Sequence, residues 1–118
     1  ILHVNGDVHF SDEVYVNTSS ISQTGTIDAW DLSGEYFLNI DTGAGLTVDG
    51  ILAPSKEGRK IILRIGSGGN LTFTHNSAAN SINDIDTGTT TSIVLTIGES
   101  AMLIYTSSKW RLIPISNT

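Results

Sequence analysis

The side chains that could perform chemistry are few and scattered in this sequence. Its three histidines, His3, His9 and His75, show no metal-ligand spacing such as HxxxH. No G-x-S-x-G motif presents a serine nucleophile, and the glycines around residue 68 do not match the phosphate-binding pattern G-x-G-x-x-G. Carboxylates for glycoside hydrolysis are present, but nothing singles out a pair. We therefore expect no enzymatic activity, no catalytic residue and no cofactor.

Two acidic segments raise the question of a calcium site. Asp84-Ile85-Asp86 and residues 41–49 place carboxylates close to glycines. Neither segment has the D-x-[DN]-x-[DN]-G spacing of a calcium loop, and neither is a glycine-rich nonapeptide repeat. Because acidic residues and glycine are also common in β-turns, we expect no metal site.

The elements that would position a site follow from a pattern that occurs three times. In each copy two short segments of alternating apolar residues lie five residues apart: 38–40 and 46–48, 63–65 and 71–73, 95–97 and 103–105. Such alternation places the apolar side chains on one face of a strand, and the residues between are typical of turns. The pattern predicts an all-β domain of antiparallel hairpins, at 35–52, 60–75 and 93–106, that form a small sandwich or prism.

The other segments are less regular. The loose alternation of apolar and polar residues in 2–16 indicates either short strands or an extended arm that lies on a neighbouring element. We therefore divide one compact domain into an N-terminal arm or short strands, 1–34, and a three-hairpin part, 35–118. Residues 76–92 predict a long exposed loop or a short irregular strand pair, and residues 110–115 a last strand. Trp30 is either a lid on the core or a surface residue that stacks on a ligand.

Several apolar residues occur where the strands should face outward. Phe37, Ile62 and Val94 occupy the same position in the three copies, and Ile104 and Ile113 also face opposite to their apolar neighbours. A sheet that is apolar on both faces is covered on both, and in a small chain the second cover can be another subunit. These five residues are the candidate subunit interface, and an ordinary sandwich with imperfect alternation is the alternative.

Composition excludes several classes of function. The 118 residues include 12 acidic and 6 basic ones, giving a net charge of −6, so nucleic acid and anionic membranes are not expected partners. No apolar run approaches the roughly 20 residues of a membrane-spanning helix. There is no cysteine, so stability must come from the core or from assembly. Because the sequence begins with Ile1 instead of Met, we expect a processed or excised part of a longer protein, or a sequence that lacks its first residues.

From Lys60 onwards the sequence resembles structural and fibre proteins of tailed bacteriophages. The resemblance rests on Ile61-Ile62-Leu63, on Gly69-Asn70-Leu71-Thr72-Phe73-Thr74-His75-Asn76, on residues 94–105 and on Lys109-Trp110-Arg111. It covers about half of the chain, and residues 1–34 show no such match. The resemblance implies a small β domain of a tail fibre, head fibre or related appendage on the exterior of the virion, commonly trimeric, in which Trp110 packs near the strand at residues 103–105.

These observations predict a bacteriophage structural protein: a trimeric fibre or decoration domain whose polar loops contact the host surface. Its expected partners are its own copies as a homotrimer, other virion proteins and a host surface glycan. A carbohydrate-binding module of a secreted enzyme is the alternative, with Trp30, Tyr36, Tyr105 or Trp110 as candidate aromatics. A fragment of a bacterial surface adhesin is a third hypothesis.

Overall fold

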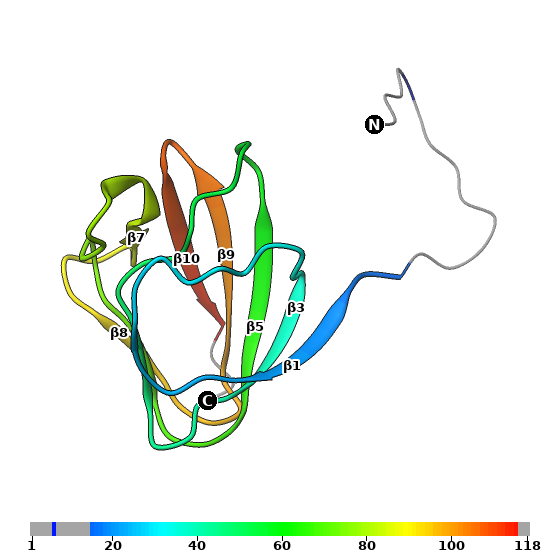
Figure 1. Cartoon of the computed structure of the whole chain (residues 1–118), viewed down its shortest axis with the longest axis vertical. Coiled ribbons are helices and arrows are strands. Elements are labelled where there is room, and N and C mark those ends of the chain that lie inside the picture. Colours follow the sequence, from blue (N-terminus) through cyan, green and yellow to red (C-terminus); the bar gives the residue numbers. More distant parts are fainter. Residues whose placement is uncertain (1–5, 7–14, 116–118) are drawn as a thin grey trace.

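The protein folds into two β-sheets that enclose one core (Figure 1). The computed structural model describes residue 6 and residues 15–115. The elements are β1 (Thr18–Ser22), β2 (Gly25–Ile27), β3 (Phe37–Asp41), β4 (Leu46–Val48), β5 (Lys60–Ser67), β6 (Leu71–Phe73), the 3-10 helix η1 (Ser81–Asn83), β7 (Ile85–Asp86), β8 (Ile93–Leu95), β9 (Ser100–Thr106) and β10 (Lys109–Ile115). The all-β prediction is confirmed. In the part of the chain that the structure describes, no helix is long and apolar enough to cross a membrane.

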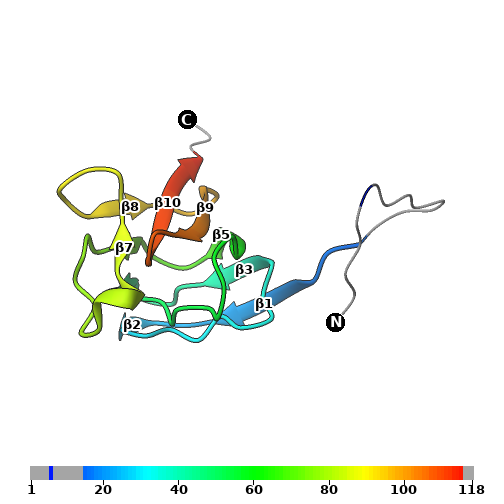
Figure 2. The ribbon, with the colours of Figure 1, turned by 90° about the horizontal axis from the view of Figure 1, so that it is seen from above.

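The two sheets are mixed and differ in width. Sheet A has six strands in the order β1-β3-β5-β9-β10-β7, and sheet B has four in the order β2-β4-β6-β8. The pairs β1–β3 and β3–β5 in sheet A, and β2–β4 and β4–β6 in sheet B, are parallel. Figure 1 shows β3, β5, β9 and β10 of sheet A side by side, and Figure 2 shows the same strands from above.

The predicted antiparallel hairpins at 35–52, 60–75 and 93–106 are wrong in their pairing. The two strands of each apolar pair do not bond to each other, since β3, β5 and β9 belong to sheet A whereas β4, β6 and β8 belong to sheet B. Each copy is therefore an arch whose strands face each other across the core. Alternation predicts which face of a strand is buried, but it is the same whether the partner lies beside the strand or opposite it.

The first three arches, β1–β2, β3–β4 and β5–β6, stack in parallel and form a short β-solenoid of about three turns. Their turns stack as well. Thr42 in the β3–β4 turn is fully buried, and its hydroxyl donates to the carbonyl of Gly69 in the next turn at 2.7 Å. Gly68 has φ +98°, and a Cβ there would lie 2.5 Å from Thr42 Oγ1 and 2.6 Å from the nitrogen of Gly43. Close contact between successive turns therefore requires glycine at position 68.

The chain reverses after the third arch. The β8–β9 arch runs from sheet B to sheet A, so β8 pairs antiparallel with β6 and β9 pairs antiparallel with β5. β9 and β10 form a true hairpin, whose turn residues Ser107 and Ser108 have φ of 54° and 62°. The predicted last strand is thus present as β10. Ile97, expected on a strand, is 59% exposed because β8 ends at Leu95.

The two segments that sequence patterns left open both join the sheets. β1 and β2 lie within residues 1–34 and pair with β3 and β4; the possible arm before them falls mostly on residues 1–5 and 7–14, outside the described residues. Residues 76–92 are not simply an exposed loop, because they contain η1 and β7 and because four of their residues are buried: Asn83, Asp84, Ile85 and Thr87. The Asn83 side chain accepts a hydrogen bond from the Ala53 nitrogen at 2.8 Å and fixes this segment to the body.

Candidate interaction surface

The outer face of sheet A carries a row of apolar side chains across four adjacent strands. Phe37 on β3 is the register partner of Ile62 on β5, Ile62 of Met102 on β9, and Met102 of Ile113 on β10. Residues in register on neighbouring strands lie about 5 Å apart on the same face. We call these four residues the apolar row.

Every member of the apolar row retains contact with solvent. Phe37, Ile62 and Met102 are partly exposed and Ile113 is 44% exposed. The residues that alternate with them, such as Leu38, Leu63 and Leu103, are fully buried, so the row is a second apolar surface outside the core. Ile104 lies on the same face, opposite Lys60 on β5 and Arg111 on β10.

Basic groups flank the apolar row. Lys60 and Arg64 on β5 are exposed, two residues to either side of Ile62, and therefore share its face. Arg111 on β10 pairs with Asp86 on β7. The pKa of Asp86 is lowered chiefly because its carboxylate accepts a hydrogen bond from the nitrogen of Gly88, and Arg111 lowers it further. Although the chain carries a net charge of −6, this face is basic beside its apolar centre.

The structure places four of the five candidate interface residues on this face. Phe37, Ile62, Ile104 and Ile113 lie together on the outer side of sheet A, whereas Val94 lies on the outer side of sheet B. Val94 is 51% exposed and is the register partner of Thr72 on β6. Val94 and Phe37 are equivalent in the sequence pattern but lie in different sheets. The third arch begins with β8 in sheet B, whereas the arch that contains Phe37 begins with β3 in sheet A. Sequence reasoning missed Met102, although Met102 follows the same alternation as Ile104.

The outer face of sheet B has a different chemistry. Thr26, Thr47 and Thr72 stand in register on β2, β4 and β6, and Val94 ends this row. The three threonines are partly or fully exposed. Of the two outer faces, only that of sheet A combines an extended apolar row with basic flanks.

The tryptophans are core residues. Trp30 is 5% exposed and forms an isolated β-bridge with Ile51. Because its ring has so little exposed surface, the burial of Trp30 argues against the hypothesis that it stacks on a ligand at the surface. Trp110 is 1% exposed, and its Nε1 donates to the carbonyl of Ile51 at 3.1 Å. The ring of Tyr105 meets that of Trp110 edge to face at 5.3 Å between centroids. This contact agrees with the packing that the phage resemblance implies for Trp110.

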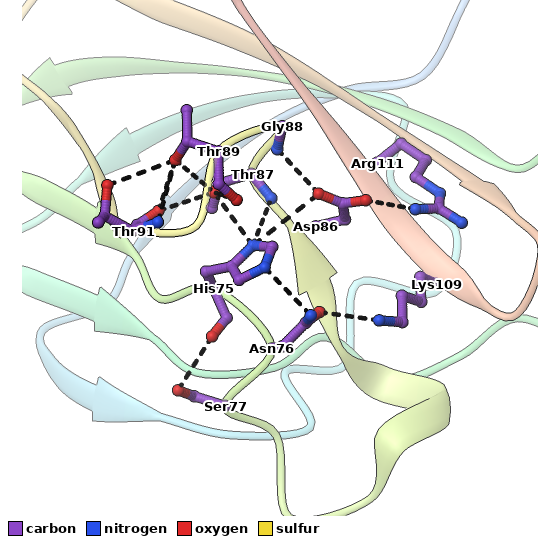
Figure 3. A network of polar contacts seen from close by, with 10 residues as sticks. All are labelled: His75, Asn76, Ser77, Asp86, Thr87, Gly88, Thr89, Thr91, Lys109 and Arg111. Carbon is purple, nitrogen blue, oxygen red and sulfur yellow. Dashed lines mark hydrogen bonds and ion pairs between the residues drawn. The ribbon is translucent and has the colours of Figure 1, made fainter.

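A polar network holds the segment after β6, β7 and the β7–β8 loop against β10 (Figure 3). His75 Nδ1 accepts from the nitrogen of Thr87 at 3.2 Å and lies 3.9 Å from Asp86 Oδ1. Lys109 Nζ on β10 donates to Asn76 Oδ1 at 3.1 Å. Together with the Arg111–Asp86 pair, these contacts secure β7 at the edge of sheet A.

The network does not have the geometry of a nucleophile with its base. Thr87 Oγ1 and Asp86 both approach Nδ1 of His75, whereas a catalytic triad needs nucleophile and carboxylate on opposite ring nitrogens. Thr87 is also only 3% exposed, and its hydroxyl lies 2.7 Å from the Thr91 carbonyl, to which it donates. The network is best explained as structural.

Two further features of the described residues bear on ligand or metal binding. Among the described residues, no group of three or more His, Cys, Asp or Glu side chains could hold a metal ion; His3 and His9 fall outside them. A surface pocket of about 230 Å³ lies beside Leu32, Pro54 and Arg59. The Arg59 guanidinium there donates to the carbonyls of Leu32, Glu35 and Lys60, so this cation is engaged by the backbone of its own chain.

Comparison with known families decides the class of protein. Residues 17–111 match the family described as the phage depolymerase C-terminal beta sandwich domain. The chain belongs to this family. No curated protein and no solved structure matches the chain.

The family match refines the expectation of a phage appendage. This phage depolymerase domain is all-β and tail-associated, a structural part of a protein that degrades host polysaccharide. The match begins at Asn17 and so includes β1 and β2, whereas the resemblance seen in the sequence began only at Lys60. The two facing sheets agree with the family's description as a sandwich, and within it the parallel arches form the short solenoid.

Proposed function

We propose that this domain is a non-catalytic structural module that joins copies of the depolymerase chain into a homotrimer through the outer face of sheet A. The apolar row carries the proposal. Four apolar side chains in register, each retaining contact with water, form the kind of surface that marks an interface between proteins. The number of three chains comes from the resemblance to phage fibres, which are commonly trimers.

Assembly also suits the working environment of a tail protein. The chain has no cysteine, so it has no disulfide to support it outside the cell. Burial of the apolar row between copies would add apolar area to a domain with a modest core. A trimer also presents each exposed polar loop three times, so that weak contacts with a host glycan or with other virion proteins are multiplied.

The carbohydrate-binding alternative is less well supported. Such modules present aromatic rings at the surface, but Trp30, Trp110 and Tyr105 are at most 6% exposed. Of the four aromatics considered for that role, only Tyr36 is partly exposed.

The experiment is to measure the mass of the chain in solution and to disrupt the row. We expect a trimer at micromolar concentration by light scattering. Ile62→Asp should shift the mass to that of a monomer, because a carboxylate at the centre of the row would be buried without a partner. Val94→Asp is the matched control: it makes the same kind of change at a half-exposed position on the opposite sheet, and it should leave the trimer intact.

Two results would contradict the proposal. One is a well-folded monomer for the unmodified chain at these concentrations. The other is an Ile62→Asp variant that keeps the assembled mass.

A further inference from the structure

We infer that a surface groove around Arg59 binds a saccharide and recognises its hydroxyl groups. The groove is bordered by the loop at residues 32–36, which leads into β3, and by the loop at residues 52–59, which leads into β5. We call it the Arg59 groove. All of its lining residues belong to one chain, so this inference does not depend on assembly through sheet A.

The groove consists of two adjoining hollows that share Gly34 and Arg59. Their volumes are about 230 Å³ and about 410 Å³. A Cβ added at Gly34, or at Gly58 in the second hollow, would meet no protein atom within 4 Å, so both glycines border open space. Because the hollows adjoin, they can hold successive parts of one extended ligand.

Arg59 supplies donors that its own chain holds in place. The partly buried guanidinium donates to the carbonyls of Leu32, Glu35 and Lys60. A guanidinium carries five N–H donors, so the described residues leave two of them, on Nε and Nη1, for a ligand. A donor group that is already fixed loses little conformational freedom when a ligand binds.

Glu35 supplies an acceptor that has no donor. Its Oε2 is buried and, among the described residues, has no hydrogen-bond partner; the ion pairs found within that part of the chain do not include Glu35. A buried acceptor without a donor is unfavourable. The side chain is only partly buried and borders the second hollow, where a ligand hydroxyl can supply the donor once the carboxylate turns outward.

The mixture of donors and acceptor indicates the chemistry of the ligand. The exposed Lys60 lines the second hollow together with Arg59 and Glu35. A simple anion there would meet the carboxylate of Glu35, and a simple cation would meet the two basic groups. A hydroxyl both donates and accepts, so a ligand with several hydroxyls can pair with all three side chains.

The apolar groups of the groove suit the C–H face of a sugar ring. Tyr36 is partly exposed in the second hollow, and Leu52 and Pro54 border the first. A tyrosine ring offers an apolar body beside a polar tip. A peptide that binds as an added strand fits less well, because β3 and β5 are paired on both sides and have no free edge. With a single partly exposed ring, the groove is a sugar subsite on a structural domain.

The test is an NMR titration of the isotopically labelled full chain. The probes are the methyl glycosides of glucose, galactose, mannose and N-acetylglucosamine, together with glucuronate. We expect at least one sugar to shift the backbone amides of residues 32–36 and 52–60 with a millimolar dissociation constant, because one ring has only about a dozen heavy atoms. Acetate and a blocked trialanine peptide are the comparisons. No shift with any sugar, or equal shifts with acetate or the peptide, would overturn the inference.

Two variants test whether the sugar occupies the groove. Glu35→Gln keeps the side-chain shape without its charge, and Lys60→Met removes the ammonium group. Each should raise the dissociation constant roughly threefold or more, since hydrogen bonds to charged groups are the stronger ones. Lys56→Met is the matched control, because Lys56 is exposed on the same loop but does not line the groove. Unchanged binding in both groove variants, with amide spectra that show them folded, would overturn the assignment.

The titration also separates this inference from the proposed function. The Ile62→Asp variant should bind the sugar with the same dissociation constant as the unmodified chain, because the groove lies within one chain. Loss of sugar binding in that variant would show that the site needs a second chain, and the inference would fail. If light scattering shows a trimer but no sugar binds, the assembly proposal stands and only the groove is wrong.

Discussion

The stacked turns of the arches predict that one buried hydroxyl stabilises the fold. Thr42→Val replaces a hydroxyl with a methyl of nearly the same volume at a fully buried site. It removes the donor to the Gly69 carbonyl at 2.7 Å and a longer contact to the Ser67 carbonyl at 3.4 Å. The backbone bond from the Thr42 nitrogen to the Ser67 carbonyl, 3.1 Å, remains, so only the Gly69 carbonyl loses its close partner.

The expected loss in the free energy of unfolding follows from the one hydrogen bond that Thr42→Val removes. The Gly69 carbonyl is only partly buried, so loss of this hydrogen bond should cost about 0.5–1.5 kcal/mol, and the valine side chain itself adds little because the volume is kept. For a domain of this size we expect the thermal midpoint to fall by roughly 4 °C for each kcal/mol.

The assay is urea unfolding at fixed chain concentration, followed by the fluorescence of the two buried tryptophans, Trp30 and Trp110. Thr47→Val makes the same chemical change on the outer face of sheet B, where the side chain is partly exposed, and should change the free energy of unfolding by less than about 0.5 kcal/mol. If the two variants unfold at the same urea concentration, the turns do not depend on the hydroxyl and the stacking argument is refuted.

Three further predictions concern the closing hairpin, the core and pH. Ser107→Asn with Ser108→Gly should raise the free energy of unfolding by about 1 kcal/mol in the same assay. Both positions have positive φ, which the pair Asn-Gly adopts readily. A lower free energy of unfolding would contradict the turn geometry. Trp110→Phe should cost roughly 2–4 kcal/mol, since the Ile51 carbonyl loses its donor and the smaller ring leaves a gap; thermal melting would disprove this if the midpoint stayed unchanged. The pKa of Asp86 is lowered from 3.8 by the nitrogen of Gly88 and by Arg111, so its contribution to stability is present above about pH 4 and is lost as the pH falls through the folded-state pKa. Asp86→Asn should therefore flatten the acid side of the stability profile, and an unchanged slope would show that other carboxylates dominate it.

In the first two copies of the alternating pattern, residues 38–48 and 63–73, the sequence predicted correctly which side chains are buried. Leu38, Ile40, Leu63, Ile65 and Phe73 alternate in the sequence and are fully buried, because a strand with one buried face must place apolar residues at every second position. The same physics predicted apolar residues on the outer face of sheet A, where Phe37 and Ile62 are found.

The pairing of the strands could not be predicted from the same pattern. A turn of five residues, such as Asp41-Thr42-Gly43-Ala44-Gly45, suits a hairpin as well as an arch. What favours the arch is the contact of Thr42 and Gly68 between successive turns, and these two residues are 26 positions apart in the sequence. The placement of Val94 was wrong for a related reason, since equivalence between copies ends where the chain reverses direction.

The parallel stacking of the first arches makes their number adjustable. Each arch contributes one strand to sheet A and one to sheet B, and its strands pair with those of the neighbouring arches in the stack. An additional arch between β4 and β5 would therefore add one strand to each sheet and leave the reversed β8–β9 arch unaltered. The same insertion would widen the outer face of sheet A by about 4.8 Å. Related proteins can therefore vary the breadth of this surface in whole-strand increments while keeping the closing hairpin unchanged.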